Sequence, residues 1–277
     1  MRFIDLFAGV GGFRLAMERA GHECVFSSEI DKYCRYVYKK NFGVEPYGDI
    51  RTIKSEEIPD FDILCAGFPC QDVSLAGKRK GLKGERTGLF YEIVRIAKDK
   101  KPKYLFLENV KGLLSSNKGW DFAEILITLD EIGYDVEWSV INSSDVVPQN
   151  RERIFIIGHF RERCTKQIFP IREGNTRNNE TSGKISEKRN RVRDNNSRIA
   201  RTLVTRDYKP NIVKVGNRYR KLTPTEYEKL QTFPVGWTAK GINEKGQEID
   251  ISDTQRYKMM GNAITVKVVY QIAKRFE

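Results

Sequence analysis

The sequence predicts an α/β fold, in which a mostly parallel sheet with helices on its faces is joined to a second, smaller and basic domain. Short apolar runs typical of buried strands alternate with helical patterns from the first residues onward. Several of these runs end directly in glycine, proline or an acidic residue, and open α/β sheets bind their ligands at such strand ends. The uneven distribution of charge predicts the second domain.

The expected elements follow one another as strand, turn and helix. We expect strands at residues 3–7, 25–29, 61–66, 104–107, 135–141 and 154–160, and helices at 13–19, 33–40 and 89–99. The last two strands are close enough in sequence to form a β-hairpin at the sheet edge. Thr223, Pro224 and Glu226 predict the start of a further helix with a capping box, and a final apolar helix ends at Phe276.

The excess of basic over acidic residues in the chain lies in one segment. The 277 residues carry a formal charge of +12, and residues 161–221 alone contain 18 Lys and Arg against six Asp and Glu. Apolar side chains such as Leu203 and Tyr208 are interleaved with these charges, which disfavours a merely solubilising or disordered tail. The segment therefore favours a surface for the phosphate backbone of a nucleic acid.

Composition also excludes several classes of protein. No apolar run reaches about 18 residues and the N-terminus has no signal-peptide pattern, so we expect no membrane span and a cytoplasmic location. Five cysteines without a CxxC pair fit a reducing compartment. With only His22 and His159 available, we expect no metal site, and a Ser-His-Asp triad would depend on one of these two residues.

Residues 8–12 form a glycine-rich turn between the first strand and its helix. Such a turn lets a ligand approach the backbone and directs helix N–H groups toward it, although it also permits simple tight packing. The dinucleotide-binding motif requires glycine at position 14, which is Arg14, so a cofactor without a pyrophosphate is favoured. Glu29 ends the second strand, where it is suited to bind the hydroxyls of a ribose or to lie at a helix N-terminus.

Cys70 lies just beyond the carboxyl end of the third strand, after Pro69, which cannot donate to a strand ladder. By itself such a thiol is either a small buried hydrophobe or a nucleophile. The following loop has four glycines and five cationic side chains in residues 77–88, typical of a lid over a polyanion and also of a surface loop. The next apolar strand, 104–107, leads directly into Glu108 at the same sheet edge, where burial should raise the pKa of this carboxyl.

Taken in order along the chain, these motifs resemble those of the DNA (cytosine-5)-methyltransferases of bacterial restriction-modification systems. The resemblance covers nearly the whole chain and is carried by residues 5–13, Glu29, 48–50, 67–71, 108–110, 149–153, 222–224, 230–234 and 261–263. Two departures from the family pattern are Phe68, where a second proline is common, and Val146-Val147, where Phe-Gly often precedes Pro148.

The resemblance implies a Rossmann-like sheet that binds S-adenosylmethionine in residues 1–160 and 257–277, and a target-recognition domain in residues 161–256. It implies methyl transfer to C5 of a flipped-out cytosine in a specific double-stranded DNA sequence, through a covalent bond between Cys70 and C6. The catalytic residues it implies are Cys70, Glu108, Arg151 and Arg153.

For S-adenosylmethionine and its product S-adenosylhomocysteine, the resemblance implies Phe7, Gly9, Gly11, Glu29, Ile30, Asp49, Ile50, Pro69, Leu89, Asn262 and Ala263. For DNA it implies Gln71, Ser74, Lys78, Arg79, Arg201, Thr202 and Arg206. We further expect a monomer associated with the nucleoid, and a cognate restriction endonuclease that shares the DNA site without binding the protein.

Two other functions compete with this interpretation. A tRNA cytosine-5 methyltransferase would use the same chemistry, but the Cys-Phe-Thr tripeptide of that branch is absent from the sequence. A non-catalytic DNA-binding protein on the same fold would not require Cys70, Glu108 and Arg153 together. A nicotinamide dehydrogenase is disfavoured by Arg14 and by the basic segment.

Overall fold

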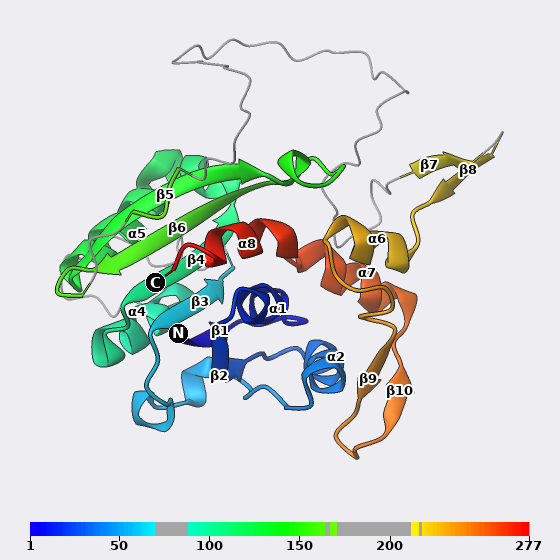
Figure 1. Ribbon diagram of the computed structural model, residues 1–277, viewed down its shortest axis with the longest axis horizontal. Coiled ribbons are helices and arrows are strands. Elements are labelled where there is room, and N and C mark those ends of the chain that lie inside the picture. The colour runs from blue at the N-terminus through cyan, green and yellow to red at the C-terminus, as the bar shows by residue number, and fades with distance from the viewer. Residues whose placement is uncertain (70–87, 164–166, 171–211, 216–217, 277) are drawn as a thin grey trace, which may run out of the picture.

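The computed structural model describes residues 1–69, 88–163, 167–170, 212–215 and 218–276 (Figure 1). Several predicted site residues lie outside these described residues: Cys70, Gln71, Ser74, Lys78, Arg79, Arg201, Thr202 and Arg206. The glycine-rich loop after Cys70 and most of the basic segment lie outside them as well.

A six-stranded sheet forms the centre of the molecule, with strand order β2-β1-β3-β4-β6-β5. Four strands run parallel to one another: β1 (Arg2–Leu6), β2 (Glu23–Ser28), β3 (Ile63–Gly67) and β4 (Tyr104–Val110). Strand β6 (Glu152–Phe160) runs antiparallel to both of its neighbours, β4 and β5 (Tyr134–Asn142). The predicted edge hairpin is therefore confirmed. Strand β4 continues three residues beyond its predicted end, so that Glu108 lies within the strand, opposite Phe155.

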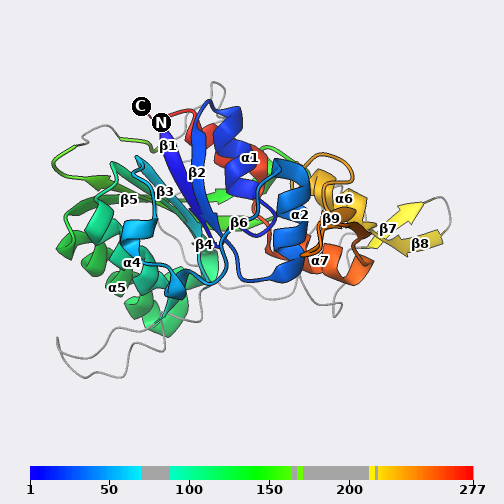
Figure 2. The ribbon, with the colours of Figure 1, turned by 90° about the horizontal axis from the view of Figure 1, so that it is seen from below.

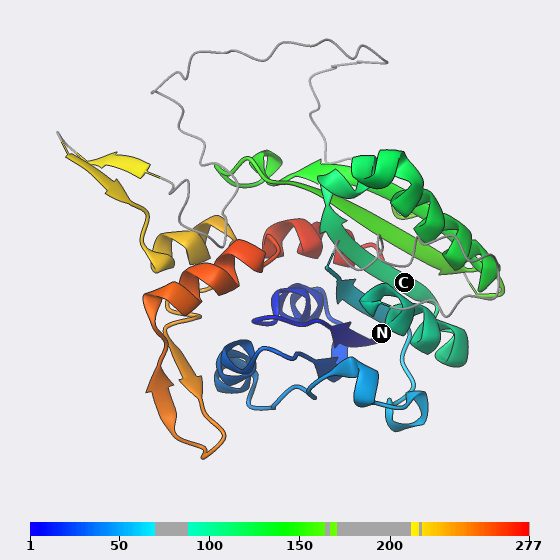
Figure 3. The ribbon, with the colours of Figure 1, turned by 180° about the vertical axis from the view of Figure 1, so that it is seen from behind.

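Helices cover both faces of the sheet (Figures 1 and 3). Helices α1 (Gly12–Arg19) and α8 (Val266–Ala273) cover one face, and α4 (Leu89–Lys100) and α5 (Trp120–Glu131) cover the other. Alternate residues of β1 enter different cores, with Phe3 packing on the α1 side and Ile4 on the α4 side. Helix α5 has no counterpart among the predicted elements, because its run of apolar and β-branched residues at 125–129 is equally typical of a strand.

The remaining elements are shorter or lie toward one end of the molecule. Helices α2 (Lys32–Phe42) and α7 (Asp253–Asn262) pack beside the sheet domain, and 3-10 turns occupy Ile50–Thr52, Ser55–Glu57, Lys111–Gly119 and Ser143–Asp145. Helix α6 (Pro224–Leu230) lies near two small hairpins, β7 (Ile212–Val215) with β8 (Arg218–Lys221) and β9 (Lys240–Ile242) with β10 (Glu248–Asp250). Figure 2 shows α6 and these hairpins beyond α2, away from α4 and α5.

Helix α6 begins with the predicted capping box. The Thr223 hydroxyl accepts a hydrogen bond from the backbone N–H of Glu226, whose carboxylate accepts one from the N–H of Thr223. Tyr227, and Phe233 just after the helix, belong to the same core as Phe3 of the sheet. A separate smaller domain is therefore not established by these contacts, and the domain boundary at residue 256 stays a prediction.

Among the described residues, no helix combines the length and the apolar character that a membrane crossing would require.

Candidate active site

A cleft of about 950 Å³ opens at the carboxyl edge of the sheet. Strands β1 and β3 are neighbours there, but the chain leaves β1 toward β2 on one side and β3 toward β4 on the other. Ligand sites of open α/β folds form at such a topological switch point. Of the predicted cofactor residues, those that line the cleft are Phe7, Gly9, Glu29, Ile30, Asp49, Ile50, Pro69, Leu89, Asn262 and Ala263.

Gly11 lies in the same turn but is not among the residues that line the cleft. A Cβ atom at this position would lie 2.2 Å from the ring of Phe42, and the backbone φ of 83° is one that residues with side chains rarely adopt. Glycine is required here so that α1 and α2 can pack closely, a role distinct from direct contact with a ligand.

The glycine-rich turn is fixed to the end of β2 by Glu29. The Gly9 N–H donates to Glu29 Oε2 at 2.7 Å, and the Asp31 N–H donates to Oε1 at 2.7 Å. Burial raises the pKa of the Glu29 carboxyl, although both backbone hydrogen bonds oppose this change. These two donors hold the carboxylate in one orientation at the wall of the cleft.

The second predicted acid of the cofactor site, Asp49, has the opposite electrostatic environment. Its hydrogen bonds to the Arg51 side chain lower the pKa of its carboxyl, and the Arg51 N–H also donates to Oδ1 at 3.0 Å. Asp49 is therefore an ionised acceptor at the cleft, suited to receive an N–H from a ligand.

Glu108 and Arg153 face each other across adjacent antiparallel strands. Arg153 Nε lies 2.9 Å from Glu108 Oε1, and Glu108 is only 8% exposed. Burial raises the pKa of the Glu108 carboxyl, while Arg153 and Arg151 act against this rise. The cleft thus contains a carboxyl that retains a proton more readily than usual, beside a guanidinium that remains a donor.

Arg151 has a different position from Arg153, although the sequence places the two at alternate positions of one motif. It is 1% exposed, and its Nη2 donates to the carbonyl oxygens of Ala263 at 2.7 Å and Gly261 at 3.2 Å. Burial lowers its pKa to about 9. Arg151 lines the cleft and holds the end of α7, which carries Asn262, together with the start of the connection to α8.

Two further polar residues support the cleft and were not among the predicted site residues. The side-chain amide of Asn109 donates to the carbonyl of Phe68 at 3.0 Å and so holds the segment that leads to Pro69. The amide of Gln231 donates to the carbonyl of Ala263 at 3.2 Å. Each lies inside a motif of the family resemblance, at residues 108–110 and 230–234, and this position is the signal that could have identified it.

Comparisons with known proteins identify the family of the chain. The family model for C-5 cytosine-specific DNA methylases matches residues 1–207 and 171–277. The chain belongs to this family. As a member of the C-5 cytosine-specific DNA methylases, it is a DNA (cytosine-5)-methyltransferase, and the mixed α/β fold predicted from the sequence is confirmed.

Several Type II methyltransferases are similar to this C-5 methylase along nearly its whole length. The relative M.DsaV of Dactylococcopsis salina is 37% identical over 99% of this chain and 85% of its own length. M1.ScrFI of Lactococcus lactis subsp. cremoris is 39% identical over 99% of this chain and 77% of its own. M.HpaII of Haemophilus parainfluenzae is 35% identical over 99% and 88% respectively.

Solved structures of low identity share the fold. The S. pombe Dnmt2 methyltransferase superposes with a TM-score of 0.74 at 18% identity and covers 99% of this chain and 97% of its own. A putative DNA modification methyltransferase encoded within an E. coli prophage gives a TM-score of 0.65 at 18% identity, with 99% and 97% covered. At this identity the likeness extends to architecture alone.

Proposed function

We propose that this C-5 methylase transfers a methyl group from S-adenosylmethionine to C5 of a cytosine flipped out of a specific double-stranded DNA sequence. The observation that carries the proposal is the composition of the cleft. Glu108 and Arg153 line it together with Pro69, the residue before Cys70, and with the turn and strand-end residues expected to hold the cofactor. The substrate atoms and the methyl donor would therefore meet at one switch point of the sheet.

The residues of the cleft fit S-adenosylmethionine by their chemistry. The half-buried Glu29 carboxylate suits paired ribose hydroxyls, and the ionised Asp49 suits an exocyclic amine. Gly9 adopts φ 55° with open space where a Cβ would stand, so a ligand can approach the backbone. When bound, S-adenosylmethionine supplies an electrophilic methyl group, and S-adenosylhomocysteine is the expected product.

The chain's own residues activate the base. C5 of cytosine is a weak nucleophile, so we assign to the Cys70 thiolate an attack on C6 that forms an S–C6 bond and moves electron density toward C5 and N3. Glu108 stabilises this density by hydrogen bonding at N3 and the exocyclic amine, which suits a carboxyl with a raised pKa. Arg153 is assigned to the cytosine O2.

The aromatic base is restored in the second half of the reaction. After C5 gains the methyl group, a base removes the C5 proton, the electrons re-form the C5–C6 double bond, and the Cys70 thiolate leaves C6. Because C6 is inaccessible within stacked DNA, the cytosine must first rotate into the cleft. We assign the binding of the DNA around this cytosine to the basic segment at 161–221 and to the glycine-rich loop after Cys70.

The decisive experiment traps the enzyme on duplex DNA that contains 5-fluorocytosine, with S-adenosylmethionine present. Fluorine cannot leave C5 as a cation, so the reaction should stop with Cys70 bonded to the base, and a denaturing gel should show a stable protein–DNA adduct. The same assay on tRNA that contains 5-fluorocytosine tests the competing RNA-directed activity. An adduct on tRNA alone would indicate the RNA-directed activity, and no adduct on a broad mixture of sequences would favour a binding protein.

Cys70→Ser is the matched control for the trap. Serine keeps the size of the side chain but is a much weaker nucleophile, so this variant should bind cofactor and DNA, form no adduct and lose turnover. Retained methylation by Cys70→Ser would overturn the assignment of the nucleophile.

A further inference from the structure

The segment that follows helix α6 contacts the cofactor turn, and the side chain of Trp237 donates a hydrogen bond to it. Trp237 Nε1 donates a hydrogen bond of 2.9 Å to the carbonyl oxygen of Val10, and Val10 belongs to the glycine-rich turn that lines the cleft. These residues are 227 positions apart in the sequence. Trp237 itself is not one of the residues that line the cleft, so it can act on a ligand only through the turn.

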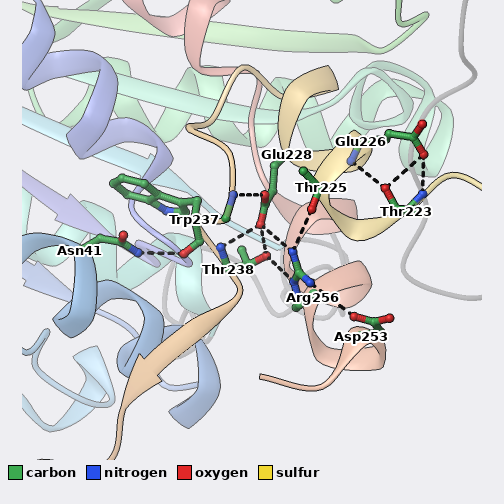
Figure 4. Close-up of polar contacts among 10 residues, drawn as sticks. Asn41, Thr223, Thr225, Glu226, Glu228, Trp237, Thr238, Asp253 and Arg256 are labelled. Carbon is green, nitrogen blue, oxygen red and sulfur yellow. Dashed lines mark hydrogen bonds and ion pairs between the residues drawn. The ribbon is translucent and has the colours of Figure 1, made fainter. Parts of the chain in front are cut away.

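Aromatic packing holds the indole in this position. The Phe42 ring meets Trp237 edge-on with ring centroids 5.4 Å apart, and the centroid of the Phe233 ring lies 5.8 Å from that of Trp237. The side-chain amide of Asn41 donates to the backbone carbonyl of Trp237 at 3.0 Å (Figure 4). The indole therefore packs against Phe42 at the end of α2 and against Phe233 of its own segment.

A buried glutamate of α6 fixes the backbone on both sides of Trp237. Glu228 is fully buried, and its carboxylate accepts from the N–H of Gly236 at 2.7 Å and from the N–H of Thr238 at 2.9 Å. The Thr238 hydroxyl and the Arg256 guanidinium also donate to it, the latter at 3.2 Å (Figure 4). A buried carboxylate with this many donors holds the backbone of residues 236–238 in one conformation.

We propose that Trp237, held in place by Glu228, is a positioning residue for the cofactor turn. The chain of contacts runs from Glu228 to the Trp237 backbone, through the indole N–H, and to the Val10 carbonyl. Without the hydrogen bond from Trp237 to Val10, the turn would populate conformations that do not bind the cofactor. The apparent affinity for the cofactor would then fall in proportion to the fraction of protein whose turn can still bind it. This inference rests on the proposed cofactor, S-adenosylmethionine.

The test is the dissociation constant of S-adenosylhomocysteine, measured by isothermal titration calorimetry on the full chain without DNA. Trp237→Phe keeps an aromatic ring against Phe42 and Phe233 but removes the donor. It should raise the dissociation constant roughly two- to tenfold, the range expected for one hydrogen bond. At saturating S-adenosylmethionine its kcat and its affinity for DNA should equal those of the unaltered protein, because an occupied turn has the same conformation.

Two control substitutions, Trp120→Phe and Glu226→Gln, separate a positioning role from an effect on overall stability. Trp120→Phe makes the same change at a side chain that is 65% exposed, and it should leave the dissociation constant unchanged. Glu228→Gln should raise the dissociation constant, whereas Glu226→Gln on the same helix should not, because glutamine still completes a capping box. Figure 4 shows Glu228 at the centre of this network, whereas Glu226 makes its drawn contacts with Thr223, apart from it.

Each outcome decides between the hypotheses. Unchanged affinity in Trp237→Phe would overturn the positioning role while leaving the proposed function intact. An equal reduction of affinity in Trp120→Phe or Glu226→Gln would also overturn it, because the effect would then follow overall stability. Failure of the unaltered protein to bind S-adenosylhomocysteine would overturn the proposed cofactor, and this inference with it.

Discussion

At the scale of single residues, Arg151 and Arg153 show that two arginines of one motif can have different roles. The family resemblance implied that both side chains are catalytic, and they occupy alternate positions of one motif. In the structure Arg153 pairs with Glu108 in the cleft, whereas Arg151 donates to the carbonyls of Gly261 and Ala263. We therefore keep Arg153 as the proposed contact to the base and assign to Arg151 the positioning of the connection between α7 and α8.

This division predicts different consequences of the same substitution. Arg151→Lys keeps the charge but cannot reproduce the donor geometry toward two carbonyls, so the free energy of unfolding should fall by about 1.5–3 kcal/mol. Arg153→Lys should change the free energy of unfolding by less and should mainly lower kcat. Urea denaturation and methylation assays on both variants check this, and a larger drop in stability in Arg153→Lys would contradict it.

Asp5 predicts a dependence of stability on pH. Complete burial raises the pKa of its carboxyl from 3.8 to about 8, and Oδ1 has no hydrogen-bond partner in the described part of the chain. Between these two values the folded protein keeps a proton that the unfolded chain has released. Stability therefore falls as pH rises through this window, by at most about 1.4 kcal/mol per pH unit from this group.

Asp5→Asn should remove this contribution, because the amide is neutral at every pH. Its oxygen can still accept the Arg14 N–H, which lies 3.3 Å from Asp5 Oδ2. The free energy of unfolding of the variant, measured in urea at several pH values between about 5 and 8, should decline less steeply than that of the unaltered protein. Identical slopes would show that Asp5 is ionised in the folded state.

At the scale of elements, local signals placed the strands and helices well where no tertiary contact competed. The β5–β6 hairpin and the start of α6 were both predicted correctly. The end of β4 was predicted at residue 107, three residues too early, because pairing with β6 extends the strand through Glu108 to Val110. Strand ends depend on the partner strand, which the local sequence does not contain.

The capping box of α6 predicts a measurable decrease in stability on mutation. Thr223→Ala removes the hydroxyl that accepts the Glu226 N–H and should lower the free energy of unfolding by about 1 kcal/mol. Thr223→Ser keeps an oxygen at the same position and is the control, with a much smaller effect expected. Chemical denaturation distinguishes them, and equal effects would mean that the cap contributes little.

At the scale of the whole molecule, the separation of charge predicts how DNA is bound. The net charge of +12 resides in residues 161–221, so the remaining residues together are neutral. The described residues of the cleft are consistent with chemistry on a base, while the charged segment is suited to phosphates whatever their sequence. Catalysis and DNA affinity should therefore depend on different parts of the chain.

The salt dependence of DNA binding tests this separation. Replacing Arg198 and Lys209 with glutamine should weaken binding and reduce the slope of log Kd against log salt by up to about 0.9 for each phosphate that the variant no longer neutralises. Replacing the exposed Lys54 and Lys98 with glutamine removes the same charge elsewhere and should leave the slope unchanged. Equal slopes in the two double variants would mean that the basic segment is not the DNA surface.

The sequence by itself determined what is encoded locally. Periodicity and turn residues predicted the order of strands and helices, and motif order identified the family and the candidate residues at the strand ends. These signals span a few residues each, which is why they can be read without a structure. The same signals did not identify α5, whose apolar run fits two kinds of element.

Only the tertiary structure decided which of these residues meet, and in what role. It brought the ends of β1 and β3 together at the switch point, turned Arg151 toward carbonyls about 110 residues away, and linked Trp237 to Val10. The physical reason is that a hydrogen bond or a buried charge depends on a partner brought near by folding. No local pattern records that partner.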